Sequence, residues 1–158
     1  MARNTKYCEG GLLSNSMPYA GDVDVKAAYE ALSASPNTVL VDVRTRAEWN
    51  FVGVPDLRAL GKEAVFTEWQ GFPAGSPVPD FVATLSADLE RKGLDKTVQI
   101  YFLCRSGARS LNAAIAMTQA GYGSCFNIAD GFEGPLDGTG HRGSAGGWKA
   151  CGLPWIQS

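Results

Sequence analysis

A chain of 158 residues is long enough to build one domain with a sizeable hydrophobic core. Its composition, 45% hydrophobic and 19% charged, is ordinary for a globular protein, and a formal net charge of -2 without any basic run argues against general nucleic-acid binding. No segment reaches the roughly 18 apolar residues of a membrane span, and the start has no signal-peptide pattern, so we expect a cytoplasmic protein with no membrane partner.

Four cysteines and one histidine limit the chemistry that the chain can support. The cysteines include no Cys-x-x-Cys pair and are too few and too scattered for a disulfide scaffold; they are Cys8, Cys104, Cys125 and Cys151. His141 is the single histidine, and no cluster of metal ligands accompanies it. We therefore expect neither a structural nor a catalytic metal site.

The beginning of the chain, residues 1–19, predicts a polar arm, and residues 20–158 predict a single domain. Cys8 lies in the arm and is interpreted as a surface thiol. After the arm, Asp24 can cap a helix that ends near the breaker cluster at 33–37. The apolar face of this helix, which we expect to pack on a sheet, consists of Val25, Ala28, Tyr29 and Leu32.

A strand is predicted at 38–43, where Thr-Val-Leu-Val-Asp-Val is mostly apolar and β-branched. It leads into a short helical turn at 44–49, capped either by Thr45 or by the end of the strand. Residues 63–67 predict a further short strand.

A loop rich in glycine and proline follows at 71–79. The aromatic side chains of Trp69 and Phe72 have two interpretations, because they either line the mouth of a pocket or only cover the core. An amphipathic helix is then predicted over 80–92, with Gly93 as its stop. Its apolar side consists of Phe81, Val82, Leu85 and Leu89.

The stretch 98–121 predicts a strand, a tight turn and a helix. Residues 98–103 are almost wholly apolar, which suits a strand buried on both faces of a parallel sheet, and Cys104 stands at its carboxyl end. The helix that follows is expected to end near Gly121 as its C-cap. Its predicted stripe consists of Leu111, Ile115, Thr118 and Tyr122.

The position of Cys104 at the mouth of a helix favours its thiolate, because free backbone N–H groups and the helix dipole stabilise an anion there. Arg105 and Arg109 are expected to bracket the sulfur with two further positive charges. Gly107 lets the backbone curl so that successive N–H groups converge, as in an anion-binding nest. The alternative is that Cys104 is an inert, buried hydrophobic residue.

Residues 124–129 predict the last strand of the sheet, with Cys125 buried and inert. The glycine-rich tail that follows contains a long stretch, 132–145, which is expected to be an insertion. It carries Asp137, His141 and Arg142, so it either forms a cationic lip over a site or is an ordinary solvated loop. The alternation of strands and helices predicts a three-layer α/β domain, with a mostly parallel central sheet and helices on both faces.

The segment Cys104-Arg105-Ser106-Gly107-Ala108-Arg109 resembles the active loop of the rhodanese-like sulfurtransferases, where four residues separate cysteine from arginine. Phosphatases with a related loop have five residues there, and their larger ring holds a phosphate. Asp42-Val43-Arg44 with Glu48, and the ending 146–155, also resemble this family. The usual histidine after the glutamate is missing, since the chain has Phe51-Val52-Gly53-Val54-Pro55-Asp56.

The resemblance implies a rhodanese-like fold and a sulfurtransferase that uses no cofactor other than a covalent persulfide on Cys104. Substrate is expected to bind at the loop residues Arg105, Ser106, Gly107, Ala108 and Arg109. Asp42, Arg44 and Glu48 are expected to be structural, with the acidic residue after Arg44 pairing with it and holding the loop. The implied partners are a small anionic sulfur donor, such as thiosulfate, and an acceptor that is cyanide, a thiol or a protein.

Two other functions stay open at this point. The first is a catalytically weak rhodanese-like module that binds a partner or carries sulfur passively. The second is a phosphatase or arsenate reductase, which the short loop disfavours. A minor further alternative gives Cys151 the role of a resolving thiol for Cys104.

Overall fold

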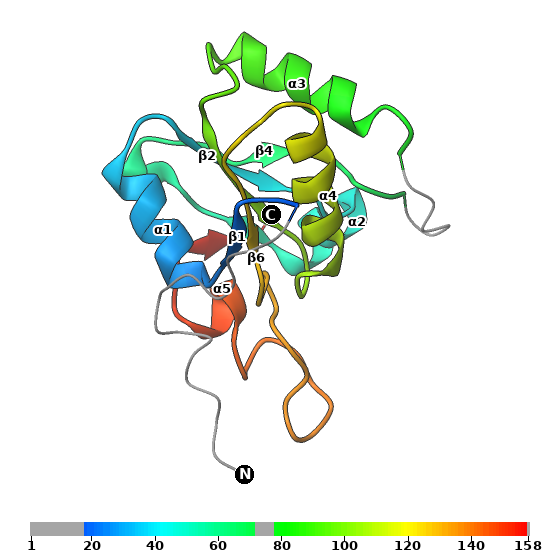
Figure 1. Cartoon of the computed structure of the whole chain (residues 1–158). Coiled ribbons are helices and arrows are strands. Elements are labelled where there is room, and N and C mark those ends of the chain that lie inside the picture. The colour runs from blue at the N-terminus through cyan, green and yellow to red at the C-terminus, as the bar shows by residue number, and fades with distance from the viewer. Residues whose placement is uncertain (1–17, 72–77, 158) are drawn as a thin grey trace.

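The computed structural model describes residues 18–71 and 78–157, which form an α/β fold (Figure 1). Within these residues the main sheet has five strands in the order β1-β6-β5-β2-β4, and all neighbouring strands are parallel. They are β1 (Gly21–Val23), β2 (Thr38–Asp42), β4 (Val65–Phe66), β5 (Gln99–Leu103) and β6 (Cys125–Ile128). A separate antiparallel pair consists of β3 (Val54–Pro55) and β7 (Trp155–Ile156).

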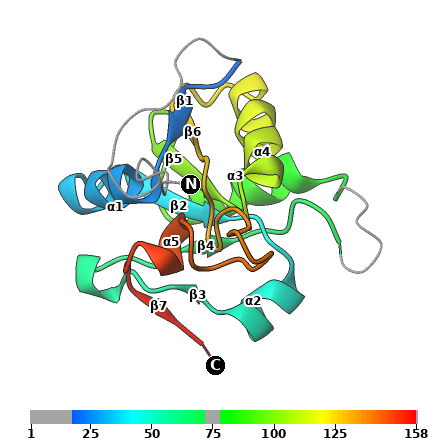
Figure 2. The ribbon, with the colours of Figure 1, turned by 90° about the horizontal axis from the view of Figure 1, so that it is seen from below.

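Helices cover both faces of the main sheet, as Figure 2 shows. One face carries α3 (Phe81–Arg91) and α4 (Ala108–Gln119), and the other carries α1 (Val25–Ala34) and the short α5 (Gly147–Ala150). The helix α2 (Arg46–Val52) follows β2, and a single 3₁₀ turn covers Arg58–Leu60. The predicted three-layer α/β architecture with a mostly parallel sheet is therefore confirmed.

The central strands β2 and β5 are buried on both faces, which explains their nearly continuous apolar sequences. Their side chains alternate between the two cores because successive residues of a strand point to opposite faces. Toward α3 and α4 lie Val39, Val41, Ile100 and Phe102. Toward α1 and α5 lie Leu40, Tyr101 and Leu103.

The helix ends follow the capping residues that the sequence contains. Asp24 caps α1 by accepting a hydrogen bond from the Ala27 N–H at 2.9 Å. Thr45 caps α2, and Glu48 completes a capping box with it, so the cap is Thr45 rather than the strand end. After α3, Gly93 adopts a φ of 77°, a conformation that favours glycine, and this confirms it as the stop.

The buried face of α4 differs from the predicted stripe. Its buried residues are Ser110, Ala113, Ala114 and Met117, while Leu111 and Ile115 are only half-buried at its edge. The helix is therefore rotated by about one position relative to the prediction. Small alanines face the sheet, and this rotation places the polar Ser110 in the interior, directly after the Cys104 loop.

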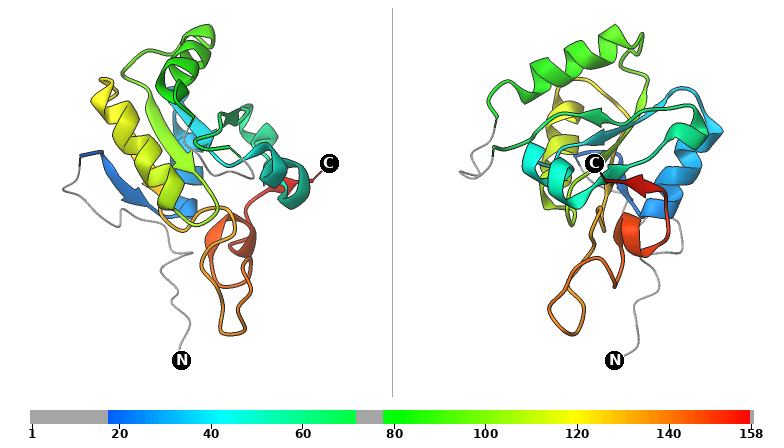
Figure 3. Two further views of the ribbon diagram at one scale, coloured as in Figure 1. Left: turned by 90° about the vertical axis from the view of Figure 1, so that its right-hand side faces the viewer. Right: turned by 180° about the vertical axis from the view of Figure 1, so that it is seen from behind.

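The candidate site lies at the carboxyl ends of β2 and β5, next to the stretch that follows β6. β5 ends at Leu103 beside Asp42 at the end of β2, and the Val43 N–H donates to the Leu103 carbonyl at 2.8 Å. The stretch predicted as an insertion extends beyond the sheet after β6, as the orange loop in Figure 3 shows. Among the described residues, no helix is long and apolar enough to cross a membrane, and no group of three or more metal-ligating side chains occurs.

Candidate active site

The side chain of Cys104 lies at the carboxyl end of β5 and faces the first turn of α4. Its Sγ accepts a hydrogen bond from the Gly107 N–H at 3.1 Å and lies 3.2 Å from the Ser110 Oγ. Cys104 is a free thiol and is only 1% exposed. Five loop residues were predicted to bind substrate. Among the described residues, Gly107 is the one of these five whose backbone N–H donates to Sγ.

The loop keeps this shape because its carbonyl groups are held from the opposite side. The Cys104 carbonyl accepts from the Phe132 N–H at 2.8 Å, and the Arg105 carbonyl accepts from the N–H groups of Glu133 and Gly134 at 3.0 and 3.3 Å. These bonds turn the loop carbonyls toward 132–134. The stretch predicted as an insertion is thus part of the framework of the loop.

Two close backbone contacts require glycine at this point. Gly107 has a φ of 110°, and a Cβ atom there would lie 2.2 Å from the Ala129 carbonyl oxygen. A Cβ atom on Gly131, whose φ is 73°, would lie 2.4 Å from the Arg105 carbonyl oxygen. Both glycines let the loop and the turn after β6 approach more closely than any side chain would permit.

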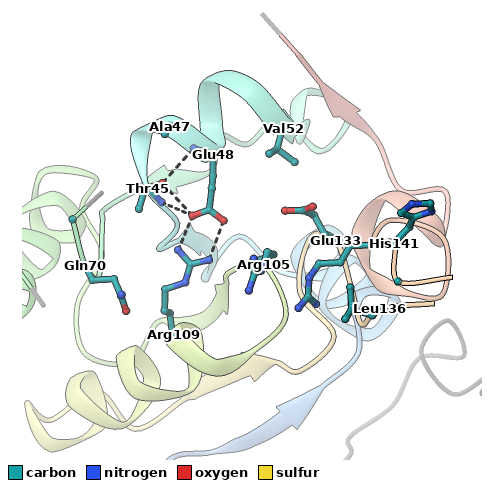
Figure 4. Close-up of a pocket in the computed structure, with 13 residues that line it drawn as sticks. Thr45, Ala47, Glu48, Val52, Gln70, Arg105, Arg109, Glu133, Leu136 and His141 are labelled. Atoms are coloured by element: carbon teal, nitrogen blue, oxygen red, sulfur yellow. Dashed lines mark hydrogen bonds and ion pairs between the residues drawn. The ribbon is translucent and has the colours of Figure 1, made fainter. Parts of the chain in front are cut away.

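Arg109 is paired with Glu48, as Figure 4 shows. Its guanidinium forms a bidentate ion pair with Glu48, at 2.6 and 2.9 Å, while Glu48 also accepts from the Thr45 N–H at 3.1 Å. Burial disfavours the charge of Glu48, but the hydrogen bonds from Arg109 and Thr45 outweigh it and lower its pKa to about 2. The hydrogen bonds that Arg109 donates to Glu48 also raise the pKa of Arg109.

The expected pairing of Arg44 with the acidic residue that follows it is wrong. Arg44 pairs instead with Asp42, through Nε to Oδ1 at 2.9 Å and Nη2 to Oδ2 at 2.7 Å, and both side chains are fully buried. Nη2 also donates to the Gly53 carbonyl at 2.8 Å, and the guanidinium stacks on the Phe132 ring at 4.2 Å. Arg44 therefore supports the segment that holds the Cys104 loop.

An open cavity of about 890 Å³ lies next to the loop (Figure 4). Its lining includes Arg105 and Arg109 from the Cys104 loop, but not Cys104 itself. The stretch 132–145 contributes Glu133, His141 and Arg142. The exposed Arg105 reaches this cavity directly, whereas Ser106 is half-buried and Ala108 is exposed. The lip is therefore mixed in charge rather than purely cationic.

Three sequence expectations concern residues around this region. Trp69 packs edge-on against Phe81 at 4.9 Å and covers the core, while Phe72 and Cys8 lie outside the described residues. Cys125 is buried as predicted, and burial raises the pKa of its thiol to about 11.

Asp130, which the sequence analysis did not single out, is buried, and burial is the main reason why its pKa is raised to about 7.

A second feature that the sequence analysis did not single out lies behind Cys104. The Ser110 hydroxyl donates to Asn127 Oδ1 at 2.6 Å, and Asn127 Nδ2 donates to Asp22 Oδ1 at 3.1 Å. The Tyr19 hydroxyl donates to the same Asp22 oxygen at 2.6 Å. Two polar residues in the sequence could have indicated this feature. Asn127 lies inside the apolar strand predicted at 124–129, and Ser110 lies on the helix that follows Cys104.

Comparisons with known proteins give a matching family and a similar solved structure. The family described as the STR4 middle domain matches residues 20–158. The crystal structure of Rv0390 from M. tuberculosis superposes with a TM-score of 0.74 at 44% identity, covering 94% of this chain and 100% of that one.

Several curated relatives carry functional names. The rhodanese-like domain-containing protein 4, chloroplastic, of Arabidopsis thaliana is 33% identical over 144 residues, which are 90% of this chain but 27% of that protein. A sulfurtransferase of Allochromatium vinosum is 27% identical over 135 residues, which are 85% of this chain and 94% of that protein.

Proposed function

The chain belongs to the STR4 middle-domain family of rhodanese-like proteins, and on that premise we propose that it is a sulfurtransferase that works through a Cys104 persulfide. The proposed reaction moves sulfane sulfur from a small anionic donor, such as thiosulfate, to cyanide or a thiol. A thiol on another protein is a further candidate acceptor. No cofactor takes part, because the sulfur is carried covalently.

The observation that carries this proposal is the hydrogen bond from the Gly107 N–H to Cys104 Sγ at the start of α4. A backbone donor at a helix N-terminus stabilises negative charge on the sulfur, so it supports the Cys104 thiolate as the form that attacks the donor. Gly107 can reach the sulfur only because it adopts a φ of 110°. The glycine and the cysteine thus act as one unit.

In the first half-reaction, the Cys104 thiolate attacks the outer sulfur of thiosulfate. A bond forms between the two sulfur atoms, the sulfur–sulfur bond of thiosulfate breaks, and sulfite leaves with the electron pair. Arg105 lines the cavity and supplies positive charge for an anionic donor. Arg109 keeps the loop in place through Glu48, so its charge is partly compensated before any donor binds.

In the second half-reaction, the acceptor attacks the outer persulfide sulfur. The bond between that sulfur and Cys104 Sγ breaks, and the electron pair returns to Sγ as a thiolate. Cyanide leaves as thiocyanate, and a thiol leaves as a persulfide. The enzyme returns to its starting state, so the two substrates react in alternation.

One observation favours the second candidate, a binding or sulfur-carrier module that turns over poorly. Cys104 is only 1% exposed, and the cavity is lined by its neighbours rather than by its sulfur. A donor therefore reaches Sγ only when side chains of the loop move aside. Slow movement would leave a protein that holds sulfur well but exchanges it slowly.

Steady-state kinetics with thiosulfate and cyanide separates these candidates. The sulfurtransferase predicts parallel double-reciprocal lines, which are typical of alternating substrates, and loss of turnover in Cys104→Ala. Cys125→Ala is the matched control, because Cys125 is also a buried free thiol but lies at the start of β6. Turnover retained in Cys104→Ala contradicts the proposal, and a persulfide formed without turnover favours the carrier module.

A further inference from the structure

The hydrogen bonds behind Cys104 form one continuous chain across three elements. Cys104 Sγ contacts the Ser110 hydroxyl at 3.2 Å, the hydroxyl donates to Asn127 at 2.6 Å, and Asn127 donates to Asp22 at 3.1 Å. Asp22 and Asn127 are direct register partners in the parallel pair of β1 and β6. The pairing of β1 with β6 therefore fixes the Asp22 end of this series of hydrogen bonds.

The directions of these bonds follow from what each group can donate. The Asp22 carboxylate can only accept, so Asn127 must present its NH₂ group to it and its amide oxygen to Ser110. The Tyr19 hydroxyl also donates to Asp22, and burial together with this bond raises the pKa of Tyr19, so the phenol keeps its proton. Asn127 is thereby locked in one orientation.

This lock determines where the single proton of the Ser110 hydroxyl goes. The proton points to Asn127 Oδ1, so only the lone pairs of Oγ face Cys104. A Cys104 thiol fits this arrangement because its S–H can donate to Oγ. A negatively charged Cys104 sulfur would meet these lone pairs at 3.2 Å, so it fits only when the hydroxyl turns to donate to it. Ser110 is 0% exposed and Asn127 4% exposed, so water cannot easily screen the mismatch.

We propose that the Ser110 hydroxyl is a two-position switch, donating to Asn127 while Cys104 is a thiol and turning to donate to Cys104 Sγ when the persulfide is discharged. Ser110 is then a catalytic residue, because it contacts the reacting sulfur. Asn127 and Asp22 are positioning residues, because they make the Ser110 hydroxyl donate to Asn127 rather than to Cys104 Sγ in the resting protein. The catalytic half of this inference rests on the proposed sulfur transfer.

The switch acts on the bond that breaks in the second half-reaction. As the acceptor bonds to the outer sulfur, the electron pair of the sulfur–sulfur bond moves onto Cys104 Sγ. A donated hydrogen bond from Ser110 stabilises that developing charge together with the Gly107 N–H. No proton is transferred, so the hydroxyl returns to Asn127 once Cys104 takes up a proton from solvent.

Removing Ser110 and removing Asn127 should have opposite consequences for discharge. Ser110→Ala deletes the donor, and we expect single-turnover discharge of the persulfide by cyanide to slow by roughly tenfold or more. Asn127→Leu deletes the competing acceptor and keeps the Ser110 hydroxyl, so discharge should proceed as fast as in the wild type or faster. Asp22→Ala removes the acceptor that orients Asn127, so it releases the lock and should behave like Asn127→Leu.

A purely structural role for the chain of hydrogen bonds predicts a different pattern, in which both Ser110→Ala and Asn127→Leu slow discharge. That pattern, or unchanged discharge in Ser110→Ala, overturns the switch. Urea unfolding of each variant shows whether it is folded. Intact-mass measurement gives the rate, because it counts the sulfur that remains on the protein.

The resting arrangement can be tested without any sulfur transfer. The Cys104 S–H stretch, isolated by infrared difference between the wild type and Cys104→Ala in acidic buffer, should show a hydrogen-bonded frequency. In Ser110→Ala it should move to a higher frequency, and an unshifted band overturns the switch. If the wild type forms no persulfide, the proposed function fails, and this infrared result alone decides whether the hydroxyl is directed as inferred.

Discussion

Glu48 and Arg109, 61 residues apart in the chain, form a bidentate ion pair that joins the cap of α2 to the first turn of α4. The pair crosses beside the Cys104 loop, and both side chains are about 20% exposed. Glu48 thus has two tasks, because it also completes the capping box with Thr45. The orientation of the Arg109 side chain therefore depends on Glu48, a residue outside the Cys104 loop.

Glu48→Gln should destabilise the fold near neutral pH and have little effect in acid. The Glu48 pKa is lowered from 4.5 to about 2 in the folded protein, so its contribution is present above about pH 4.5 and disappears as pH falls toward 2. For a pair that is partly exposed, we expect about 2 kcal/mol in the free energy of unfolding at pH 7.

Urea unfolding at pH 7 and at low pH measures this difference. The matched control is Asp56→Asn, because Asp56 also forms a bidentate contact with an arginine, Arg58, but on the surface. This control should leave stability unchanged within error. An equal loss in both variants would contradict a special role for the Glu48–Arg109 pair.

Gly107→Ala should abolish formation of the persulfide as well as reduce stability. Its Cβ would lie 2.2 Å from the Ala129 carbonyl oxygen, so either the loop or the end of β6 must move. Gly93→Ala is the control, because Gly93 also has a positive φ, 77°, but has nothing within 4 Å of the added Cβ. The control should lose about 1 kcal/mol of unfolding free energy and keep full activity. Activity retained in Gly107→Ala would show that the loop tolerates a different path.

Asp42→Asn should be strongly destabilising, because it leaves the charge of Arg44 in the core without a counter-ion. We expect a loss of about 3 kcal/mol or more, as is typical when one member of a buried ion pair is removed. The double variant Asp42→Asn with Arg44→Met should recover part of this loss. Additive losses in the double-mutant cycle, measured by urea unfolding, would mean that the two side chains are not coupled.

Asp130→Asn should stabilise the protein at alkaline pH. Burial, with a smaller contribution from the charge of Asp24, raises the pKa of Asp130 to about 7 against the opposing effect of nearby backbone N–H groups. Neither carboxylate oxygen has a hydrogen bond of good geometry among the described residues. Because the raised pKa favours the protonated form in the folded state, the destabilisation grows from about pH 4 and is complete above about pH 7.

The comparison for Asp130 is therefore between two pH values within each protein. Wild-type stability should fall between pH 5 and pH 8 by more than that of Asp130→Asn, as measured by urea unfolding. Parallel pH profiles for the two proteins would show that Asp130 keeps a partner for its charge.

Local patterns were sufficient to predict most of the elements. The apolar runs at 38–43 and 98–103 define strands because both faces of β2 and β5 are buried, and Asp24, Thr45 and Gly93 mark helix ends through capping geometry. The β1, β3 and β7 strands were not predicted, since two or three residues show little periodicity, although the equally short β4 was predicted at 63–67.

Several of the wrong or missing assignments depend on contacts between distant segments. Glu48 pairs with Arg109, 61 residues away, which leaves Arg44 to pair with its near neighbour Asp42 and to stack on the distant Phe132. The link from Ser110 to Asp22 needs β1 to lie next to β6, although the two strands are more than 100 residues apart. Neighbour order in a parallel sheet cannot be read from local propensity.

If Cys104 carries the transferred sulfur, thiosulfate treatment without reductant should change the mass of the intact protein. We expect one added sulfur atom, located at Cys104 by peptide mapping, removed by cyanide, absent in Cys104→Ala and retained in Cys125→Ala. An added sulfur that persists in Cys104→Ala, or that maps to Cys125, would contradict this role of Cys104.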